Sequence, residues 1–213
     1  MAKLLKRCVP VIFAAALVFF VLTASIALPI YIRPFYYTHI DALALDEASG
    51  FTKPQIRQAY DEVLDYLTLP NVPFSTGELR HSVEGAAHFA DCKALFDLNA
   101  AVLLISTAII LCLLILRRMG KVPSLRRAAF FAGAGAITLP LSVGFLASLN
   151  FDRAFVIFHR IFFPGKDNWI FNPWTDEIIL VLPQQFFMNC AILIGVGLLS
   201  LSLTLLILGR KRK

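Results

Sequence analysis

Two histidines of this chain lie among charged residues and close to long apolar segments. His88 occurs in EGAAHFADCKALFDLN, residues 84–99, with Glu84 four residues before it and Asp91 three residues after it. On a helix these spacings place the three side chains on one face. A carboxylate beside an imidazole fixes the tautomer of the ring and favours its protonated form, as a proton-shuttling histidine requires. The alternative is a helix whose polar face is merely solvated.

The second histidine, His159, lies in the aromatic segment FHRIFFPGKDNWIFNPWTDEII, which begins at residue 158. A belt of aromatic residues at a membrane surface accounts for Trp169, Trp174 and several phenylalanines. Such a belt does not require the charged residues found among them, which are Arg160, Lys166, Asp167 and Asp176. We therefore predict a charged pocket at the membrane boundary that contains both histidines and suits a lipid-attached substrate.

Several neighbours of the histidines are candidates for orienting or substrate-binding roles. Asp91 is the expected orienting carboxylate of His88, with simple solvation of the helix as the alternative. Trp169 is expected to line the pocket and exclude water, which would protect an acyl transfer from hydrolysis. Asp176 is expected either to hold Arg160 or to begin the apolar segment that follows it.

Four long apolar segments must position these residues. Of the 213 residues, 58% are hydrophobic, and they form runs close to the roughly 20 residues that cross a bilayer as a helix. The runs are 9–32, 98–116, 128–149 and 187–208. The first could be taken for a secretory signal, but its apolar length exceeds the usual core of such a signal. The sequence therefore predicts an all-α membrane protein with four transmembrane helices.

The distribution of charge predicts the orientation of these helices. Twelve of the 20 Lys and Arg residues, and none of the 14 acidic residues, lie in the N-terminal segment, the turn at 117–127 and the tail at 209–213. The positive-inside rule then places both termini and this turn in the cytoplasm, and segments 33–97 and 150–186 outside. The net charge of +6 thus indicates membrane anchoring and not nucleic-acid binding.

The two outer segments are predicted to form an extracellular cap. Segment 33–97 contains a helix that begins after Thr52 and ends before Pro70, because apolar residues recur at helical spacing between them. A second helix is predicted to start between residues 76 and 84 and to continue through His88 into the second span. Segment 150–186 is predicted to be an irregular aromatic loop, because proline and glycine interrupt it.

The remaining histidines and the cysteines are weaker candidates. His39 is expected at the membrane interface and His81 on the surface of the cap. The four cysteines define no disulfide framework. For Cys92 and Cys190 two interpretations stay open, a disulfide between them or, more commonly, small buried apolar side chains.

The two histidine-containing segments, HFADCKALFDLN and FHRIFFPGKDNWIFNPWTDEIILVLPQQFF, resemble those of the bacterial lipoprotein intramolecular transacylases, a family of four-span membrane proteins. The resemblance covers nearly the whole chain. It implies two catalytic histidines at the interface between an extracellular cap and the membrane, at His88 and His159. The family's usual DVK after the first histidine is DCK here, so Cys92 stands in place of a valine.

The resemblance also implies a reaction. The substrate would be a diacylglyceryl-modified lipoprotein with a free N-terminal amine, whose sn-2 acyl chain moves from the glycerol oxygen to that nitrogen to give the lyso form. The intermediate closes an eight-membered ring, so holding the two ends of one flexible molecule together could contribute several kcal/mol. The expected partners are lipoproteins and membrane lipids, with no nucleic acid.

Two histidines can supply the proton transfers that this reaction needs. His88 is predicted to be the base, with Glu84 and Asp91 stabilising its imidazolium, and activity should fall on the acid side near a pKa of about 6.5. His159, beside the cation Arg160, is predicted to donate a hydrogen bond to the ester. No cofactor, metal or acyl-enzyme nucleophile is expected.

Two other classes of protein stay open. In a metal-dependent hydrolase, His88, Asp91 and His159 would be three ligands of a zinc ion with one open position. Metal analysis, and activity after chelation, would distinguish this class. In a non-catalytic receptor or scaffold the cap would bind a peptide, and alanine at both histidines would leave function unchanged.

Overall fold

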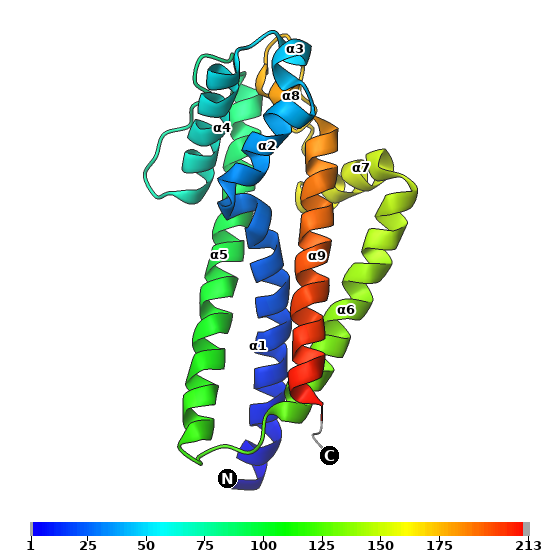
Figure 1. Cartoon of the computed structure of the whole chain (residues 1–213). Helices are drawn as coiled ribbons and strands as arrows, with labels where there is room; N and C mark the ends of the chain where they lie inside the picture. The colour runs from blue at the N-terminus through cyan, green and yellow to red at the C-terminus, as the bar shows by residue number, and fades with distance from the viewer. Residues whose placement is uncertain (1, 211–213) are drawn as a thin grey trace. The chain divides into compact units, whose positions relative to one another are not determined.

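The computed structural model describes the backbone of residues 2–210, and the side chains in this range except those of residues 2–7, 139, 141, 143 and 145–148. Residues 211–213 of the predicted tail lie outside the described residues. All regular secondary structure in this range is helical (Figure 1), which confirms the predicted all-α class. The helices are α1 Ala2–Tyr31, α2 Arg33–Ala42, α3 Leu45–Ser49, α4 Lys53–Thr68, α5 Val83–Arg118, α6 Arg126–Leu149, α7 Phe151–Phe162, α8 Ile178–Val181 and α9 Gln184–Gly209.

The chain divides into two compact units. The first consists of Met1–Leu28, Asn99–Leu146 and Ile192–Lys213, and the second of Pro29–Leu98 and Ala147–Ala191. Every acidic residue of the sequence lies in the second unit, so the charged residues of the first are all basic. The two predicted catalytic histidines both belong to the second unit.

Three of the described helices are long and apolar enough to cross a membrane. They are Cys8–Tyr31, Val83–Arg118 and Gln184–Gly209, and they correspond to the first, second and fourth predicted spans. The third predicted span corresponds to α6, a helix of 24 residues with Pro140 inside it. Its role as a span stays a prediction.

The first unit is held together by apolar side chains and by close helix contacts. Phe13 and Leu17 of α1 pack with Leu125 and with Ala128 and Ala132 of α6. Gly133 of α6 approaches α9 so closely that an added Cβ would lie 2.7 Å from the carbonyl oxygen of Ser202. Small residues at such contacts are typical of helices that pack within a membrane, where backbone approach replaces hydrophobic burial as the source of attraction.

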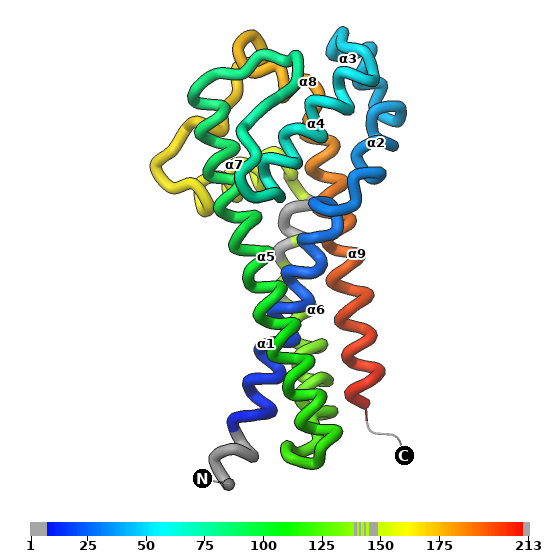
Figure 2. The backbone as a smooth tube through the Cα atoms, turned by 90° about the vertical axis from the view of Figure 1, so that its left-hand side faces the viewer, coloured from blue at the N-terminus to red at the C-terminus, as the bar shows by residue number. Residues whose placement is uncertain are grey.

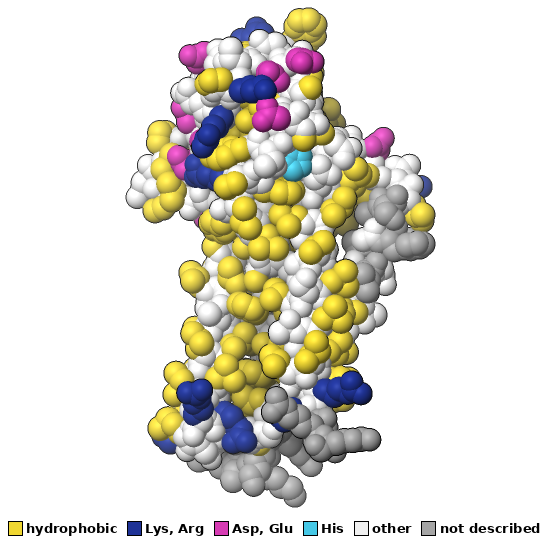
Figure 3. Space-filling view, in the orientation of Figure 1, with side chains coloured by type: hydrophobic (Ala, Val, Ile, Leu, Met, Phe, Trp, Pro, Cys, Tyr) yellow, Lys and Arg dark blue, Asp and Glu magenta, His cyan; other side chains and the backbone are white. Residues whose placement is uncertain are grey.

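Charged residues gather at one end of the first unit. The turn between α5 and α6 and the end of α9 lie together there (Figures 1 and 2). On the face shown in Figure 3, the Lys and Arg side chains of this unit cluster at the same end, and hydrophobic side chains cover much of the remainder. This distribution is the one expected of helices anchored in a bilayer by basic residues.

The second unit contains the first helix predicted in segment 33–97. The helix α4 begins after Thr52, whose backbone N–H donates to Oε1 of Gln55 at 2.9 Å, and ends at Thr68. Its apolar face is buried, and Tyr60 on that face stacks on Tyr36 of α2 with ring centroids 3.7 Å apart. The hydroxyl of Tyr36 donates to the carbonyl oxygen of Val181 at 2.7 Å. Helices α2, α4 and α8 are thereby joined.

Segment 150–186 differs from the irregular loop predicted for it. Residues 151–162 form α7, and residues 178–181 form the short helix α8. The side chain of Asn150 caps α7 by accepting a hydrogen bond from the N–H of Arg153 at 2.9 Å. Because the first proline and the glycine of the segment follow only at 164 and 165, they end α7 and do not prevent it.

Candidate functional site

Two buried imidazoles face each other in the second unit. His88 lies in the second turn of α5 and His159 in the last turn of α7, and their ring centroids are 5.8 Å apart with an interplanar angle of 34°. Only 5% of His88 and 7% of His159 is exposed. The structure therefore brings together the two histidines that the sequence predicted to share a pocket.

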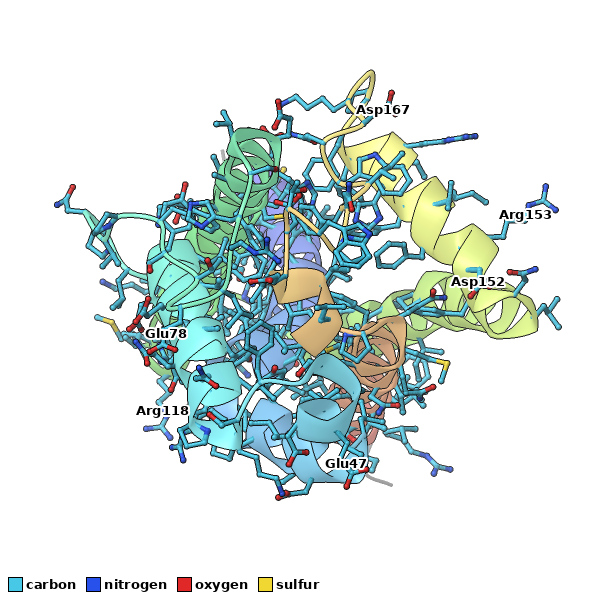
Figure 4. The ribbon with its side chains drawn as sticks, turned by 90° about the horizontal axis from the view of Figure 1, so that it is seen from above. Glu47, Glu78, Arg118, Asp152, Arg153 and Asp167 are labelled. Atoms are coloured by element: carbon cyan, nitrogen blue, oxygen red, sulfur yellow. The ribbon has the colours of Figure 1, made fainter. Side chains whose placement is uncertain are left out.

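Aromatic rings surround the histidine pair. Phe163 and Phe171 make T-shaped contacts with His88, with centroids 4.9 and 5.5 Å from its ring. Trp169 stacks on His159 at 4.6 Å and an interplanar angle of 28°. Figure 4 shows Arg153 pointing outward from α7, whereas His159, six residues later, is on the buried side of that helix. The surroundings of both imidazoles are therefore largely apolar.

Each imidazole has one ring nitrogen engaged and one available. Nδ1 of His159 lies 2.8 Å from the carbonyl oxygen of Phe155, which can only accept, so this nitrogen carries the proton and Nε2 keeps a lone pair in the neutral ring. Nε2 of His88 lies 3.4 Å from Sγ of Cys92. Nδ1 of His88 is buried without a hydrogen-bond partner among the described residues. The spacing of four between His88 and Cys92 on one helix could have revealed this contact from the sequence.

The pair is poorly basic because both rings are buried. His88 precedes the apolar run that begins at Leu98; burial lowers its pKa to about 4, with the nearby His159 adding to the effect. The pKa of His159 is also lowered by burial, and its hydrogen bond to a carbonyl opposes this only in part. Asp91 favours protonated His88, as the sequence predicted, but loss of hydration outweighs this attraction and the pKa falls. Arg160 is exposed and is not what lowers the pKa of His159.

Asp91 does not orient His88 through a hydrogen bond. Its carboxylate instead pairs with Nζ of Lys166 at 2.5 Å and accepts from Nδ2 of Asn168 at 3.1 Å. Glu84, the other predicted partner, is exposed. The acidic residue after His88 therefore attaches the segment that follows α7 to α5, and Trp169 extends from this segment over His159.

Asp176 attaches the same segment to the start of α5. It is 4% exposed and accepts hydrogen bonds from the backbone N–H and the hydroxyl of Ser82, both at 2.8 Å. A carboxylate is favoured there because the free N–H groups of a helix N-terminus carry partial positive charge. Contact with Arg160, the first of the two alternatives predicted for Asp176, is not made, because its carboxylate is engaged by Ser82 and Thr175. Gly85 permits the approach, since an added Cβ would overlap Oδ1 of Asp176.

The chain matches one protein family over most of its length. The model of that family, lipoprotein intramolecular transacylase Lit, matches residues 11–187. The chain belongs to the Lit family. This confirms the resemblance found in its histidine-containing segments, and it makes the protein an acyltransferase.

Solved structures of one Lit protein have the same fold. The in meso structure of the membrane-integral lipoprotein intramolecular transacylase Lit from Bacillus cereus is 25% identical, with a TM-score of 0.87 over 96% of this chain and 94% of that chain. Two structures of Bacillus cereus Lit in which a histidine is replaced by arginine or alanine are 24% identical. Each has a TM-score of 0.82 over 98% of this chain, and over 92% and 93% of those chains respectively. A search among curated proteins gave no match. Together with its three apolar helices, the match identifies this Lit protein as a membrane protein.

Other sequence candidates lie outside the histidine pair of this Lit protein. His39 is buried, with Nδ1 2.6 Å from the carbonyl oxygen of Phe35 and Nε2 2.9 Å from the amide nitrogen of Asn189. Both of its ring nitrogens are thus engaged, as in a structural residue. His81 is exposed, as expected for the cap surface. All four cysteines are free.

The alternative zinc site does not assemble from its predicted ligands. The carboxylate of Asp91 is engaged by Lys166 and Asn168, as described above. Among the side chains that the structure describes, no group of three or more His, Cys, Asp or Glu residues is arranged to hold a metal ion.

We expect Gly85→Ala to destabilise the protein by about 1–3 kcal/mol, because the new methyl group displaces the buried carboxylate of Asp176. The melting temperature in detergent should fall by several degrees for a chain of this size. In an Asp176→Ala background the same change should be neutral or stabilising, since only the higher helix propensity of alanine remains. Equal effects in the two backgrounds would show that this contact does not constrain residue 85.

Proposed function

We propose that the protein moves the sn-2 acyl chain of a diacylglyceryl-modified lipoprotein to the N-terminal amine of the same molecule, and that His88 and His159 transfer the protons. Family membership supports the reaction class. The observation that carries the mechanism is the buried pair of imidazoles, 5.8 Å apart, which offer different ring nitrogens to a substrate. One bond from nitrogen to the acyl carbon forms and one ester bond breaks, so substrate and product are isomers.

His159 is the base in this proposal. Its Nδ1 proton is held by the carbonyl oxygen of Phe155, which leaves the lone pair on Nε2 for the amine of the substrate. The amine attacks the ester carbonyl and gives one proton to Nε2. The same nitrogen then returns the proton to the glyceryl oxygen as the ester bond breaks. A single histidine serves as base and then as acid, as in other acyl transfers.

His88 is the hydrogen-bond donor. An imidazole nitrogen is a far better acceptor than a thiol sulfur, so the contact between Cys92 and His88 is best made by an S–H group that donates to Nε2. The proton of the neutral ring is then on Nδ1, which has no partner in the described part of the chain. A buried donor of this kind stabilises the negative charge that develops on the ester oxygen. This division of duties is the reverse of the one predicted from the sequence.

The aromatic residues around the histidine pair favour acyl transfer over hydrolysis of the ester. A water molecule competes with the amine for the same ester carbonyl. Phe163, Phe171 and Trp169 occupy the space around the two rings, and their apolar surfaces offer water few hydrogen bonds. Exclusion of water also strengthens the interaction between the donor and the developing charge.

The reaction is proposed to take place on the outer face of the membrane. Both termini and the turn at 117–127 would lie in the cytoplasm, with segments 33–97 and 150–186 outside. The support is the wholly basic charge of the first unit, gathered at the end that carries this turn. The site, which lies entirely in the second unit, would then meet lipoproteins that have already been exported.

An impermeant maleimide should test this topology in intact cells. In a chain in which Cys8 and Cys112 are replaced by serine, Ser49→Cys should be labelled from outside, because it lies in segment 33–97. Ser124→Cys, in the turn of basic residues, should react only after the cells are opened. The reverse labelling pattern would overturn both the orientation and the outer location of the reaction.

Mass spectrometry of a synthetic diacyl lipopeptide tests the function itself. The purified protein should convert it into an isomer of equal mass with an N-acyl and a single O-acyl chain. His88→Ala and His159→Ala should each lower kcat by about 10²–10⁴-fold, since each removes a proton-transfer group or a donor to the oxyanion. His88→Gln, which keeps an N–H donor, should retain more activity than His88→Ala, whereas His159→Gln, which has no base, should not exceed His159→Ala.

The exposed residue His81 provides the control, and His81→Ala should leave kcat unchanged. Thermal unfolding must show that each variant is folded. Release of free fatty acid in place of the isomer would identify a hydrolase, and chelation would then test for a metal. If the variant that combines His88→Ala and His159→Ala is properly folded and its function is unchanged, the protein is a receptor or scaffold.

The acid limb of kcat should lie below pH 6.5. The base must be neutral to act, and burial lowers the pKa of His159, so protonation abolishes activity only below the ordinary histidine value. kcat at saturating substrate is the appropriate measurement, because kcat/KM also reports the free amine of the substrate, with a pKa near 8. A limb in kcat above pH 6.5, with acyl transfer rate-limiting, would contradict the assignment.

A further inference from the structure

The side-chain amide of Asn168 leaves one buried atom unsatisfied. Its Nδ2 donates to Oδ2 of Asp91 at 3.1 Å, and because an ionised carboxylate can only accept, this contact fixes the orientation of the amide. Its carbonyl oxygen, Oδ1, is buried without a hydrogen-bond partner among the residues that the structure describes. Buried carbonyl groups without partners are rare in folded proteins because the lost hydration is not replaced. Asn168 thus presents an acceptor for which the described chain provides no donor.

The segment that carries this acceptor contacts the histidine site. Asn168 immediately precedes Trp169, which stacks on His159, and it binds Asp91, which follows His88 by three residues on the same face of α5. Lys166 pairs with the other carboxylate oxygen of Asp91, Oδ1, at 2.5 Å and also holds the segment in place. The second unsatisfied atom of the site is Nδ1 of His88. The site therefore offers a substrate one unused donor, one unused acceptor and the lone pair of His159.

These three groups complement a primary amine that attacks an ester. The ester oxygen accepts from Nδ1 of His88, and one N–H of the amine is taken by Nε2 of His159. The other N–H stays on nitrogen throughout the reaction and becomes the N–H of the product amide. Left without a partner in an apolar pocket, it would lower the affinity for substrate. It would also leave the nitrogen lone pair free to rotate away from the carbonyl carbon.

We propose that Oδ1 of Asn168 accepts this second N–H, so that the site selects a primary amine and orients its lone pair towards the ester. The proposal rests on the transfer to nitrogen proposed above, and it assigns recognition of the amine to a residue other than the histidines. Asp91 and Lys166 are then positioning residues, which act by holding the amide of Asn168 with its oxygen towards the substrate.

A substrate with only one N–H isolates this contact. An N-methylated lipopeptide keeps the proton that His159 removes and the acyl chain that moves, but it lacks the N–H assigned to Asn168. The substrate is tested with the wild type and with Asn168→Leu. The bulk of the methyl group slows both proteins. The informative quantity is therefore the ratio of kcat/KM for the primary substrate to kcat/KM for the N-methyl substrate, compared between the two proteins. Leucine has a similar volume and no acceptor.

We expect the ratio to be about tenfold smaller in Asn168→Leu than in the wild type, since only the wild type loses a hydrogen bond to the methylated substrate. The matched control is Asp167→Leu. Asp167 lies on the same segment, and its side chain points outward (Figure 4), so the ratio should stay at the wild-type value. If Asn168→Leu melts below the wild type, Asn168→Ala carries the same comparison, because a general loss of structure lowers both rates and leaves the ratio unchanged.

An unchanged ratio in both Asn168 variants would overturn this assignment and leave the proposed function intact, because the wild type would still convert the primary amine. Failure of the wild type to convert the primary amine would overturn the proposed function, and the assignment with it.

Discussion

The attachment of segment 163–177 to the first turns of α5 is the constraint on which the site depends. Asp176 accepts from the backbone N–H and the hydroxyl of Ser82, immediately before the helix, and Lys166 and Asn168 bind Asp91 more than two turns later. The aromatic residues between these two points are thereby held in contact with the imidazoles. The two attachments are ionic or charge-assisted, and they fix the segment in position so that Trp169 and Phe171 contact the imidazoles.

Burial of the two imidazoles follows from this attachment, and it determines their chemistry. An imidazole in water is partly protonated near neutral pH, whereas burial lowers the pKa of both of these rings and favours their neutral forms, because the charged form loses its hydration. In a neutral ring the two nitrogens differ, and the contacts made at one of them determine what the other can do. A backbone carbonyl at Nδ1 of His159 and a thiol at Nε2 of His88 therefore engage different ring nitrogens of two chemically identical side chains.

The cysteine at position 92 shows how a small change in sequence enters this arrangement. Cys92 lies one helical turn after His88, so the two side chains share a face of α5. Its Sγ contacts Nε2 of His88, which an aliphatic side chain could not bind. The thiol adds a weak donor in a place where burial makes each hydrogen bond count for more than it would in water. In the proposed mechanism this contact sets the tautomer of His88.

Much of the fold was determined by local pattern. Runs of apolar residues, the cap at Thr52 and the continuous helical periodicity through His88 identified the long helices, because these features depend on neighbours within one or two turns. The segments that contain His88 and His159 were also evident in the sequence. The contacts made by the neighbours of these histidines were not evident in the sequence. Asp91, expected to orient His88, binds Lys166 and Asn168, and the acceptor of Asn168 had no signal in the sequence. Residues 75 to 77 positions apart come into contact only after the chain has folded, and the burial that lowers the basicity of both imidazoles exists only once aromatic residues from both segments surround them.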